Sequence, residues 1–577
     1  MRKIKEKNAK KRGNFMPKKK KPRNEERQVI LQEKKNNEVV AKGAGIFFVI
    51  ITAFYPLFIW LSGYIYLTRE KTFFYWIITA VSAAVMVALL FAAKGSVVIK
   101  NYYAEDEPAR RVSAAEWALL AFIAWAFVSA AVSAAANGYI NADGHGVVWH
   151  GASTRYEGFI SYLCYAAGFI IIARYYKPKR LHFLLLAGSA VLISAYGVAQ
   201  FLGLDILGLF PYERMYQTEG IPLYGPLSAF FRTTLGNVNI VSAYCSFAVV
   251  LFAGLYAVSR SKWQYLYLGA GIAAFALSLT TGYSGDAHKV AVSAAMVLLV
   301  PYWTADRERT GKILIILSGW CLVYAAQSAY LSAMKRQYEA GEFFPPRDRS
   351  FLQAYAHKNI TLFIILAAVL LAAGLCLLLL LKKWPGKPMK IAGIIFVPVL
   401  MIGGMMSLEL VGARLSPDNF IWQAREMMHG RLEDNFGSGR GWIWKNAVSV
   451  IPDNPVFGTG PDTFEYALGY DRQMEAVELF NVKFDKAHNI FLQIAVCMGI
   501  PALTAFLIFL GGVFVPAVKK AFERPLLLAF GGASLSYAIQ SFFCVEVPIT
   551  TPLFWIALGV MASEVWMARV GAENIDL

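Results

Sequence analysis

Residues 360–381 read ITLFIILAAVLLAAGLCLLLLL, an apolar run without a charged side chain that ends at Lys382 and Lys383. A helix that crosses about 30 Å of hydrocarbon needs roughly 20 apolar residues. This stretch therefore predicts a membrane-spanning helix, and further apolar stretches of similar character lie on both sides of it. They are residues 45–67, 73–93, 116–135, 157–173, 181–203, 237–258, 265–280, 290–304, 313–333, 391–410, 489–516, 526–544 and 552–568.

The composition agrees with this pattern. Of 577 residues, 57% are hydrophobic and 16% are charged, whereas soluble proteins are about 45–50% apolar and about 25% charged. This balance excludes a disordered chain and argues strongly against a soluble globular enzyme. The predicted fold class is an all-α polytopic membrane protein with about 12–14 transmembrane helices and one large extracytoplasmic helical loop. The short stretches 265–280 and 290–304 are the weakest of the predicted spans.

The positive charge of the chain is concentrated at its N-terminal end. Residues 1–45 hold 16 Lys and Arg against 5 Glu, which is +11 of a formal net charge of +18. We expect residues 1–44 to be a disordered, basic cytoplasmic tail that contacts anionic lipid, and we expect no nucleic-acid partner. Lys and Arg also fill the short loops 94–115, 174–180, 259–264, 305–312, 382–390 and 517–525. Since cytoplasmic loops are rich in Lys and Arg, both termini are predicted to be cytoplasmic.

Two segments on the opposite side, 334–359 and 411–488, are too long to be simple connections. The second has helical patterns of its own at 418–432 and 440–450. The predicted organisation is therefore a tail (1–44), the first part of a transmembrane bundle (45–410), an extracytoplasmic loop subdomain (411–488) and the last part of the bundle (489–577).

Unusual polar residues gather on this predicted outer side. Arg155 lies in GASTRYEG, Arg232 in FFRTTLGNVN, Lys289 in TTGYSGDAHK, Arg440 in GSGRGWIWKNA and His488 in KAHNIFLQ. Ionisable groups at the ends of spans are costly unless they have partners or a function. Their clustering in one compartment suggests an outward-facing site, although a single Arg at a span end more often snorkels or forms an ion pair.

Arginine beside tryptophan at a membrane surface suits a phosphate carried by a lipid, because guanidinium binds phosphate oxygens with two parallel hydrogen bonds. A nearby His can act as a general base. The turn VFGTGPDTF (456–464) either offers backbone N–H groups to such a ligand or is only a turn. The chain has no CxxC, HExxH, GxxxxGK[ST] or dinucleotide motif, so we expect no metal and no cofactor.

Two segments taken together resemble the signature region of the O-antigen ligase family, which includes related polysaccharide polymerases and protein O-oligosaccharyltransferases. They are RGWIWKNAVSVIPDNPVFGTGPDTFEYAL and KAHNIFLQIAVCMGIPALTAFL. TRYEGFISYLCY and TTLGNVNIVSAY also resemble family segments, so the similarity spans roughly residues 150–515. The matching positions are Arg440, Trp442, Trp444, Pro455, Gly458, Gly460, Phe464, His488, Asn489 and Gly499.

The resemblance implies inverting, metal-independent glycosyl transfer on the outer face of the cytoplasmic membrane, from a glycan on undecaprenyl diphosphate to an acceptor hydroxyl. By position, His488 would be the base and Arg440 a diphosphate ligand. Trp444, Asn489, Arg155, Arg232 and Lys289 are the further candidates for binding the diphosphate or glycan.

The chain departs from the family pattern in one place. Relatives often carry an Arg in a Thr-x-Ser-Arg-Gly stretch, whereas Thr280–Asp286 here contains none. Either Lys289, Arg155 or Arg232 replaces that Arg, or diphosphate binding is weakened, or this member is inactive.

A transporter of polysaccharide or lipid-linked oligosaccharide is the competing function. Such a protein would place its polar site near the middle of the membrane rather than at its outer face. The acceptor, whether a lipid or wall anchor, another glycan or a protein, stays open because the donor-side motifs are shared.

Overall fold

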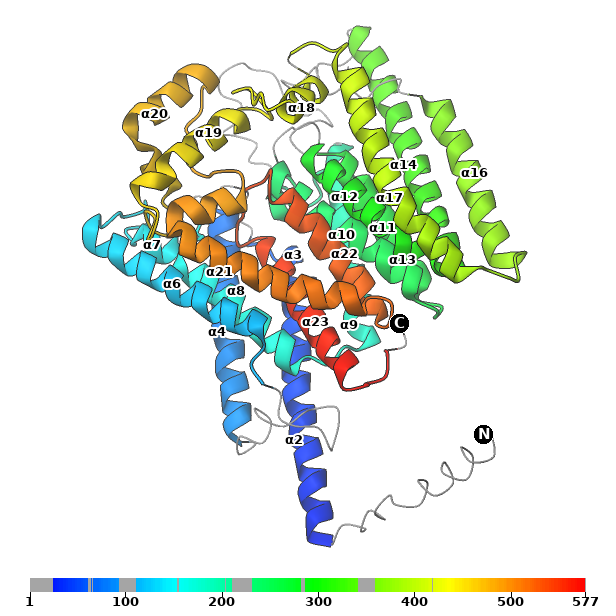
Figure 1. The fold of residues 1–577 in the computed structure, drawn as a ribbon, viewed down its shortest axis with the longest axis horizontal. Coiled ribbons are helices and arrows are strands. Elements are labelled where there is room, and N and C mark those ends of the chain that lie inside the picture. The colour runs from blue at the N-terminus through cyan, green and yellow to red at the C-terminus, as the bar shows by residue number, and fades with distance from the viewer. Residues whose placement is uncertain are drawn as a thin grey trace, which may run out of the picture.

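The computed structural model describes residues 24–60, 64, 66–92, 111–152, 155–202, 204–209, 231–281, 286–340, 359–417, 419–575 and 577. Within them the protein is built from helices, and its one sheet pairs the short strands β1 (Phe231–Arg232) and β2 (Gly236–Asn237) (Figure 1). The helices are α2 (Asn24–Val49), the π-helical turn η1 (Ile50–Phe54), α3 (Tyr55–Leu57), α4 (Leu67–Ala92), α6 (Ala114–Ala136), α7 (Val147–His150), α8 (Phe159–Tyr175), α9 (Arg180–Phe201), η2 (Thr233–Leu235), α10 (Val238–Val258), α11 (Gln264–Leu279), α12 (Asp286–Leu298), α13 (Val300–Thr304), α14 (Arg307–Glu339), α16 (Ile360–Leu379), α17 (Gly386–Gly412), α18 (Phe420–Met428), α19 (Arg440–Val450), η4 (Ile451–Asp453), α20 (Phe464–Phe480), α21 (Ile490–Lys520), α22 (Pro525–Gln540) and α23 (Thr551–Arg569).

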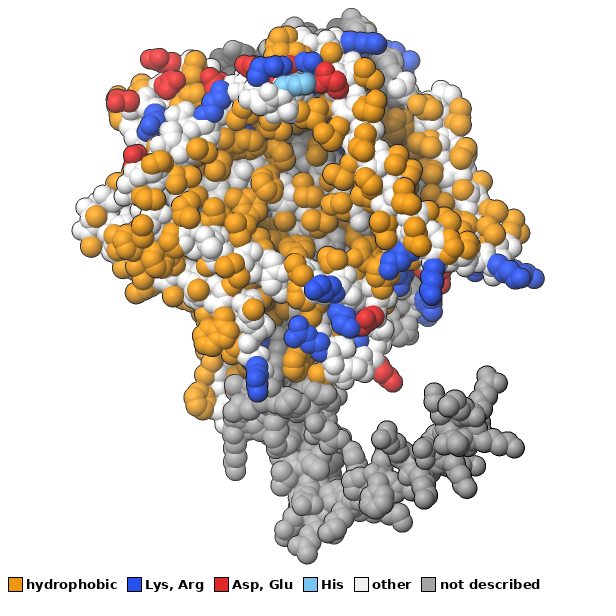
Figure 2. All heavy atoms as spheres, in the orientation of Figure 1, with side chains coloured by type: hydrophobic (Ala, Val, Ile, Leu, Met, Phe, Trp, Pro, Cys, Tyr) orange, Lys and Arg blue, Asp and Glu red, His pale blue; other side chains and the backbone are white. Residues whose placement is uncertain are grey.

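The predicted fold class is confirmed. Ten of the described helices are long and apolar enough to cross a membrane, and three more apolar helices are shorter. Figure 2 shows a broad band of hydrophobic side chains across the face in view, with charged side chains gathered above and below it. The weak stretch predicted at 290–304 is two helices, α12 and α13, because Pro301 stands at the start of the second and interrupts the helical hydrogen bonds.

The centre of the bundle is close-packed. Helix α10 is buried along almost its whole length, between α11, α12 and α22. A Cβ atom on Gly254 of α10 would lie 2.6 Å from the Cα of Ala529 in α22, so the two backbones touch. Small residues permit this approach of spanning helices. By contrast, α16 and α17 lie at the periphery and expose long runs of Leu, Ile, Val and Met, as expected of a lipid-facing surface (Figure 1).

The predicted outer segment 411–488 holds α18, α19 and α20. In Figure 1, α19 and α20 lie above the start of α21, and α18 lies beside the upper end of α17. The pattern at 440–450 coincides with α19, and the pattern at 418–432 is shortened to α18. The sequence did not indicate α20, whose helical course is interrupted at Gly469, where φ is +72°.

The predicted N-terminal tail differs from the structure over part of its length. Residues 1–23 lie outside the described residues, whereas Asn24–Ala44, predicted to be disordered, belong to α2. From Asn24 to Lys42 the chain has no Gly or Pro and is rich in Glu, Gln, Lys and Val, most of which are good helix formers. The helix of the first span therefore continues into the basic segment instead of starting at its edge. Of the predicted outer segment 334–359, α14 covers the beginning and residues 341–358 lie outside the described residues.

Candidate active site

Four segments meet at the N-terminal end of α21. They are the turn before α8, the start of α19, the turn that precedes α20 and the loop that leads into α21. This last loop is Asp485-Lys486-Ala487-His488-Asn489, and it supplies most of the polar groups. Non-glycine residues with positive φ are concentrated in these segments: among the described residues, Tyr156, Ser438, Asp462 and His488 have φ of 55°, 64°, 61° and 50°. Such conformations are costly and cluster at functional sites.

His488, the predicted base, lies two residues before the first residue of α21, Ile490. Its Nδ1 is buried and has no hydrogen-bond partner among the described residues. Burial is the largest effect on the pKa of His488, and together with the charges of Arg440, Arg155 and Lys486 it lowers this pKa to about 3, against the opposing effect of Asp485. The structure thus brings His488, Arg440 and Arg155 into one electrostatic group and keeps the imidazole neutral.

Arg440 is the first residue of α19, and its guanidinium is anchored by two backbone carbonyls. Nε donates to the carbonyl of Phe543 at 2.7 Å, and Nη1 donates to the carbonyl of Gly437. Nη2 forms no hydrogen bond with a described residue, so one edge of the planar group remains available. Burial lowers the pKa of Arg440, but an arginine stays charged at physiological pH.

Arg155 is paired with Asp485 in a bidentate ion pair. Nε lies 2.7 Å from Oδ2 and Nη2 lies 3.1 Å from Oδ1. Both side chains are about a quarter exposed, so the pair lies at the edge of the site. Although burial raises the pKa of Asp485, Arg155 lowers it below its usual value, so the carboxylate is ionised.

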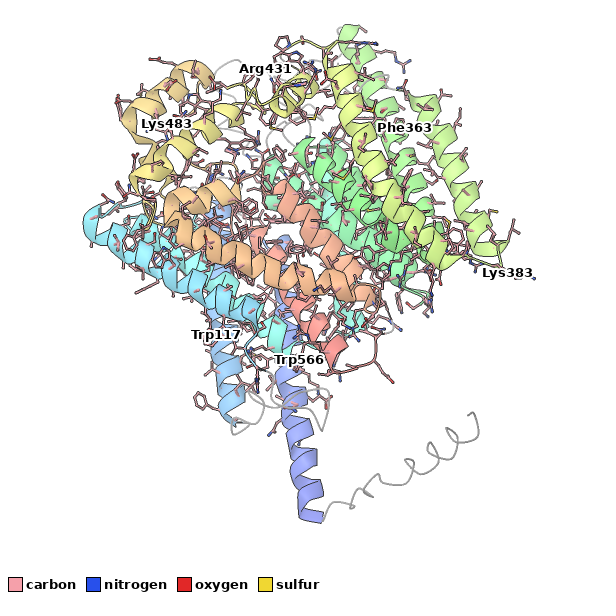
Figure 3. The ribbon with its side chains drawn as sticks, in the orientation of Figure 1. Trp117, Phe363, Lys383, Arg431, Lys483 and Trp566 are labelled. Carbon is pink, nitrogen blue, oxygen red and sulfur yellow. The ribbon has the colours of Figure 1, made fainter. Side chains whose placement is uncertain are left out.

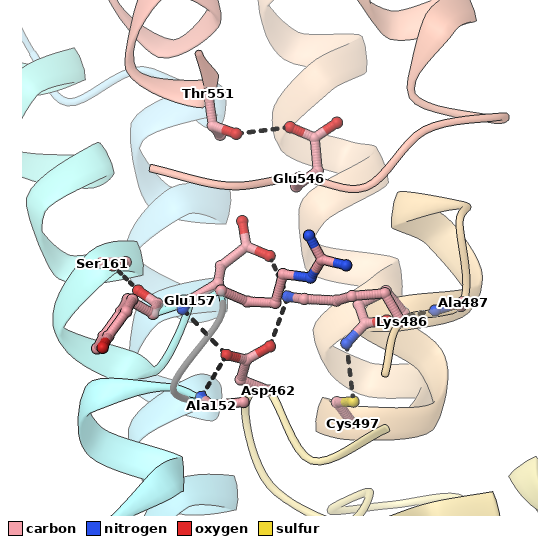
Figure 4. Close-up of polar contacts among 12 residues, drawn as sticks. Ala152, Glu157, Ser161, Asp462, Lys486, Ala487, Cys497, Glu546 and Thr551 are labelled. Atoms are coloured by element: carbon pink, nitrogen blue, oxygen red, sulfur yellow. Dashed lines mark hydrogen bonds and ion pairs between the residues drawn. The ribbon is translucent and has the colours of Figure 1, made fainter. Parts of the chain in front are cut away.

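A fully buried ion-pair cluster, which no sequence pattern indicates, lies beneath this edge. Lys486 Nζ lies 2.7 Å from Oε2 of Glu157 and 2.5 Å from Oδ1 of Asp462 (Figure 4). Asp462 also accepts hydrogen bonds from the backbone N–H groups of Ala152 and Glu157, at 2.7 Å and 3.1 Å. Burial lowers the pKa of Lys486, but the two carboxylates outweigh burial and raise it above its ordinary value. The cluster joins three segments of the site, two residues from His488.

The Gly-rich turn 456–464 binds the backbone of α21 and does not offer its N–H groups to a ligand. The N–H groups of Thr459 and Gly460 donate to the carbonyls of Val496 and Cys497, at 3.1 Å and 2.7 Å. These N–H groups are therefore committed to α21 and are not directed at a ligand. The turn docks onto α21 where Gly499, with φ +82° and ψ 170°, bends the helix.

The glycines of this contact are required by close packing. A Cβ on Gly499 would lie 2.1 Å from the carbonyl oxygen of Val456, and a Cβ on Gly458 would lie 2.4 Å from the carbonyl carbon of Cys497. The glycine pattern that carried the family resemblance is thus explained by backbone-to-backbone docking.

Two predicted substrate-binding residues have structural contacts. Asn489 caps α21, because its Oδ1 accepts hydrogen bonds from the N–H groups of Phe491 and Leu492 at 2.9 Å and 3.1 Å. Trp444 packs its ring against Phe436 and Phe543, and its buried Nε1 has no hydrogen-bond partner among the described residues. Both residues lie in the segments that form the site.

The other two predicted cations are not linked to His488 by a described contact. Arg232 lies in β1, with its guanidinium 5.9 Å from the ring centre of Phe201 and near Tyr64. Lys289 lies in the first turn of α12. Residues 282–285, which contain most of the departure from the family pattern, lie outside the described residues. Within the described part of the chain, no three His, Cys, Asp or Glu side chains gather to form a possible metal site.

Residues 364–507 match a family model described as O-antigen ligase. A comparison with curated proteins finds no match. The protein is a multi-pass α-helical membrane protein, and the match confirms its resemblance to the O-antigen ligase family. At the level of the family, the match supports a ligase- or polymerase-like enzyme. The matched range contains Arg440, Asp462, Lys486 and His488, whereas Arg155 reaches the same site from outside it.

Proposed function

We propose that the protein is a membrane glycosyltransferase that moves a glycan from undecaprenyl diphosphate to an acceptor hydroxyl on the outer face of the membrane. One observation carries the proposal: a neutral histidine with an unpartnered, buried ring nitrogen lies among the positive charges of Arg440 and Arg155, within the O-antigen ligase domain and its immediate surroundings. A diphosphate leaving group gains negative charge as it departs and needs such cations, and an attacking hydroxyl needs such a base.

In the proposed reaction the acceptor oxygen attacks the anomeric carbon of the glycan, and a new C–O bond forms on the face opposite the diphosphate. The bond from the anomeric carbon to the diphosphate oxygen breaks, and the diphosphate leaves with the electron pair. His488 takes the proton of the acceptor hydroxyl. The free Nη2 edge of Arg440 stabilises the charge that develops on the leaving group.

Arg155 is the second diphosphate ligand in this proposal and takes the place of the Arg missing from Thr280–Asp286. Its guanidinium already binds the carboxylate of Asp485 with two parallel hydrogen bonds, a geometry that also suits a phosphate. Since Arg155 and Asp485 lie at the exposed edge of the site, the diphosphate can replace Asp485 without opening the buried cluster around Lys486. Arg232 and Lys289 stay as candidates for contacts further along the donor.

Donor binding also activates the base. In the free protein, burial and three cations hold the pKa of His488 at about 3, where an imidazole accepts protons poorly. A bound diphosphate brings negative charge beside the same cations and raises this pKa. His488 is therefore the strongest base when the donor is bound, so that it takes up few protons from hydroxyl groups while the donor is absent.

A transporter fits the geometry less well. Arg440 begins a helix of the outer segment, and His488 precedes the first turn of α21, so both lie at the ends of helices rather than halfway along spans. Transporter sites lie near the middle of the membrane, at broken helices. The break of α21 at Gly499 is filled by the turn 454–460 and offers no such site.

The experiment is to delete the gene and analyse the surface glycans, which also identifies the acceptor. Loss, shortening or detachment of one glycan is expected, with rescue by the wild-type protein and by Arg431→Lys, a change in an exposed arginine paired with Glu426. Arg440→Lys should rescue poorly, because the compact ammonium group of lysine cannot form the parallel hydrogen bonds of a planar guanidinium. Unchanged glycans after deletion, or full rescue by Arg440→Lys with wild-type donor affinity, would count against the proposal.

A further inference from the structure

A cavity of about 390 Å³ lies at the opposite end of the bundle from the candidate active site. It is formed where the N-terminal end of α6 meets the C-terminal parts of α21 and α23, and its lining includes Arg111, Gly512, Val565, Trp566 and Arg569. Figure 3 labels Trp566 at the lower side of the helix bundle, above the lower ends of α2 and α4, whereas Lys483, close to His488 in the chain, is in the upper part of the molecule.

The lining of the cavity is partly apolar and partly positively charged. Val112, Ala115, Val513, Ala562 and Val565 form apolar walls, while Arg111 and Arg569 bring two exposed positive charges. Neither arginine forms an ion pair with a described residue, and none of the described residues that line the cavity is acidic. This combination fits a ligand with an apolar part and a net negative charge.

The first turn of α6 does not supply the anion site. Ser113 and Glu116 form a capping box in which the side chain of each accepts a hydrogen bond from the backbone N–H of the other, at 3.2 Å and 2.7 Å. An anion in the cavity would therefore be bound by the guanidinium groups of Arg111 and Arg569.

We propose that this cavity binds the headgroup of one anionic phospholipid. Its phosphate is held between Arg111 and Arg569, its acyl chains follow the apolar walls, and Trp566 lies at the level where aromatic side chains meet the membrane interface. A soluble anion would gain nothing from the apolar walls, and a zwitterionic lipid carries no net charge to balance two arginines. The lipid also joins the ends of three helices, of which α21 carries the loop of His488 at its other end.

The cavity depends on a close contact between α6 and α21. A Cβ on Gly512 would lie 2.9 Å from the Cβ of Ala115, so the two helices touch beside the cavity and hold its walls at a fixed separation. The site is thus built into the packing of the bundle and is not a property of exposed charge alone.

The test is native mass spectrometry of the purified full-length protein with phosphatidylglycerol and phosphatidylethanolamine of identical acyl chains. The wild-type protein should retain one phosphatidylglycerol with about tenfold preference, because charge-assisted hydrogen bonds to the phosphate add to the apolar contact. Arg111→Gln with Arg569→Gln should abolish the preference. Ala562→Phe, which fills the cavity without changing its charge, should abolish it as well.

The matched control is Lys519→Gln with Lys520→Gln, which removes two positive charges from the end of α21 outside the cavity. This control should keep the preference within about twofold, and inorganic phosphate at millimolar concentration should not displace the lipid. Equal loss in the control would indicate diffuse surface charge and overturn the proposal. So would an unchanged preference in the folded arginine or Ala562→Phe variants, or displacement by inorganic phosphate, which would indicate a site for soluble anions.

Discussion

His488 has a conformation and an environment that suit a base that is switched on by its substrate. Its backbone is in the left-handed region, and its pKa in the free protein is about 3. The pH dependence of kcat/KM reports the free enzyme, and that of kcat reports the enzyme with donor bound. A general base loses activity as the pH falls through its pKa, and in the proposed mechanism a bound diphosphate raises the pKa of His488. We therefore predict that the acidic limb of kcat lies at higher pH than that of kcat/KM. Coincident limbs would contradict donor activation of His488.

Lys486 holds the site together through two carboxylates that have no access to water. Replacing it with Met leaves Glu157 and Asp462 buried without their cation, which costs about 3–5 kcal/mol when one partner of a buried ion pair is removed. We predict a large fall in the unfolding temperature for Lys486→Met. Lys483→Met, three residues earlier and exposed, is the control and should change it little. Equal stability of the two variants would show that the cluster is not structural.

The site residues that could be predicted from the sequence belong to local motifs, whereas those that could not are defined by contacts between distant positions. Arg440 and His488 stand out because they are ionisable residues that belong to motifs in a recognisable order along the chain. In the sequence, Lys486, Asp462 and Asp485 are ordinary loop residues and Glu157 is the first residue of a predicted span. Nothing local shows that Lys486 and Glu157, 329 positions apart, share a hydrogen bond. The signal that was present is the charged pair Asp485-Lys486, separated from His488 by one alanine and followed by a span.

At the scale of elements, the break in α21 is the feature on which the site depends. Gly499 has φ +82°, and a Cβ there would lie 2.1 Å from the carbonyl of Val456. Gly499→Ala should destabilise the protein by about 1–3 kcal/mol and reduce activity, because the turn 454–460 can no longer dock. Gly511→Ala on the same helix is the control, since no atom lies within 4 Å of a Cβ there and Ala favours the helix. Thermal unfolding of both variants measures the difference, and an equal effect would contradict the docking account.

Some helices could be predicted from the hydrophobic pattern of the sequence, and others could not. Long apolar runs such as α16 were predicted to within a few residues, because hydrocarbon demands a continuous apolar helix. The helix α20 was not predicted, since Gly469 interrupts it and its surroundings decide its course. The docking of the Gly-rich turn on α21 was not predictable either, because it joins two backbones that share no local pattern.

At the scale of the whole molecule, the order of spans and the basic loops predict that the candidate site and the lipid cavity face opposite compartments. We predict that a cysteine at Lys445, on α19, reacts with a membrane-impermeant thiol reagent in intact cells, in a background without the six native cysteines. A cysteine at Lys520, at the end of α21, should react only after the membrane is opened. The reverse pattern would invert the orientation and place the site inside.

The most direct test of the central claim is glycosyl transfer by the purified protein, followed as the release of undecaprenyl diphosphate from a glycan donor in the presence of acceptor. His488→Ala should bind the donor but lose about a hundredfold or more in kcat, as expected for removal of a general base. His429→Ala is the matched control, because His429 lies in the same outer segment, exposed and paired with Glu409 at 2.8 Å. We predict that this control keeps wild-type activity. Full activity of His488→Ala, or equal loss in both variants, would contradict the account.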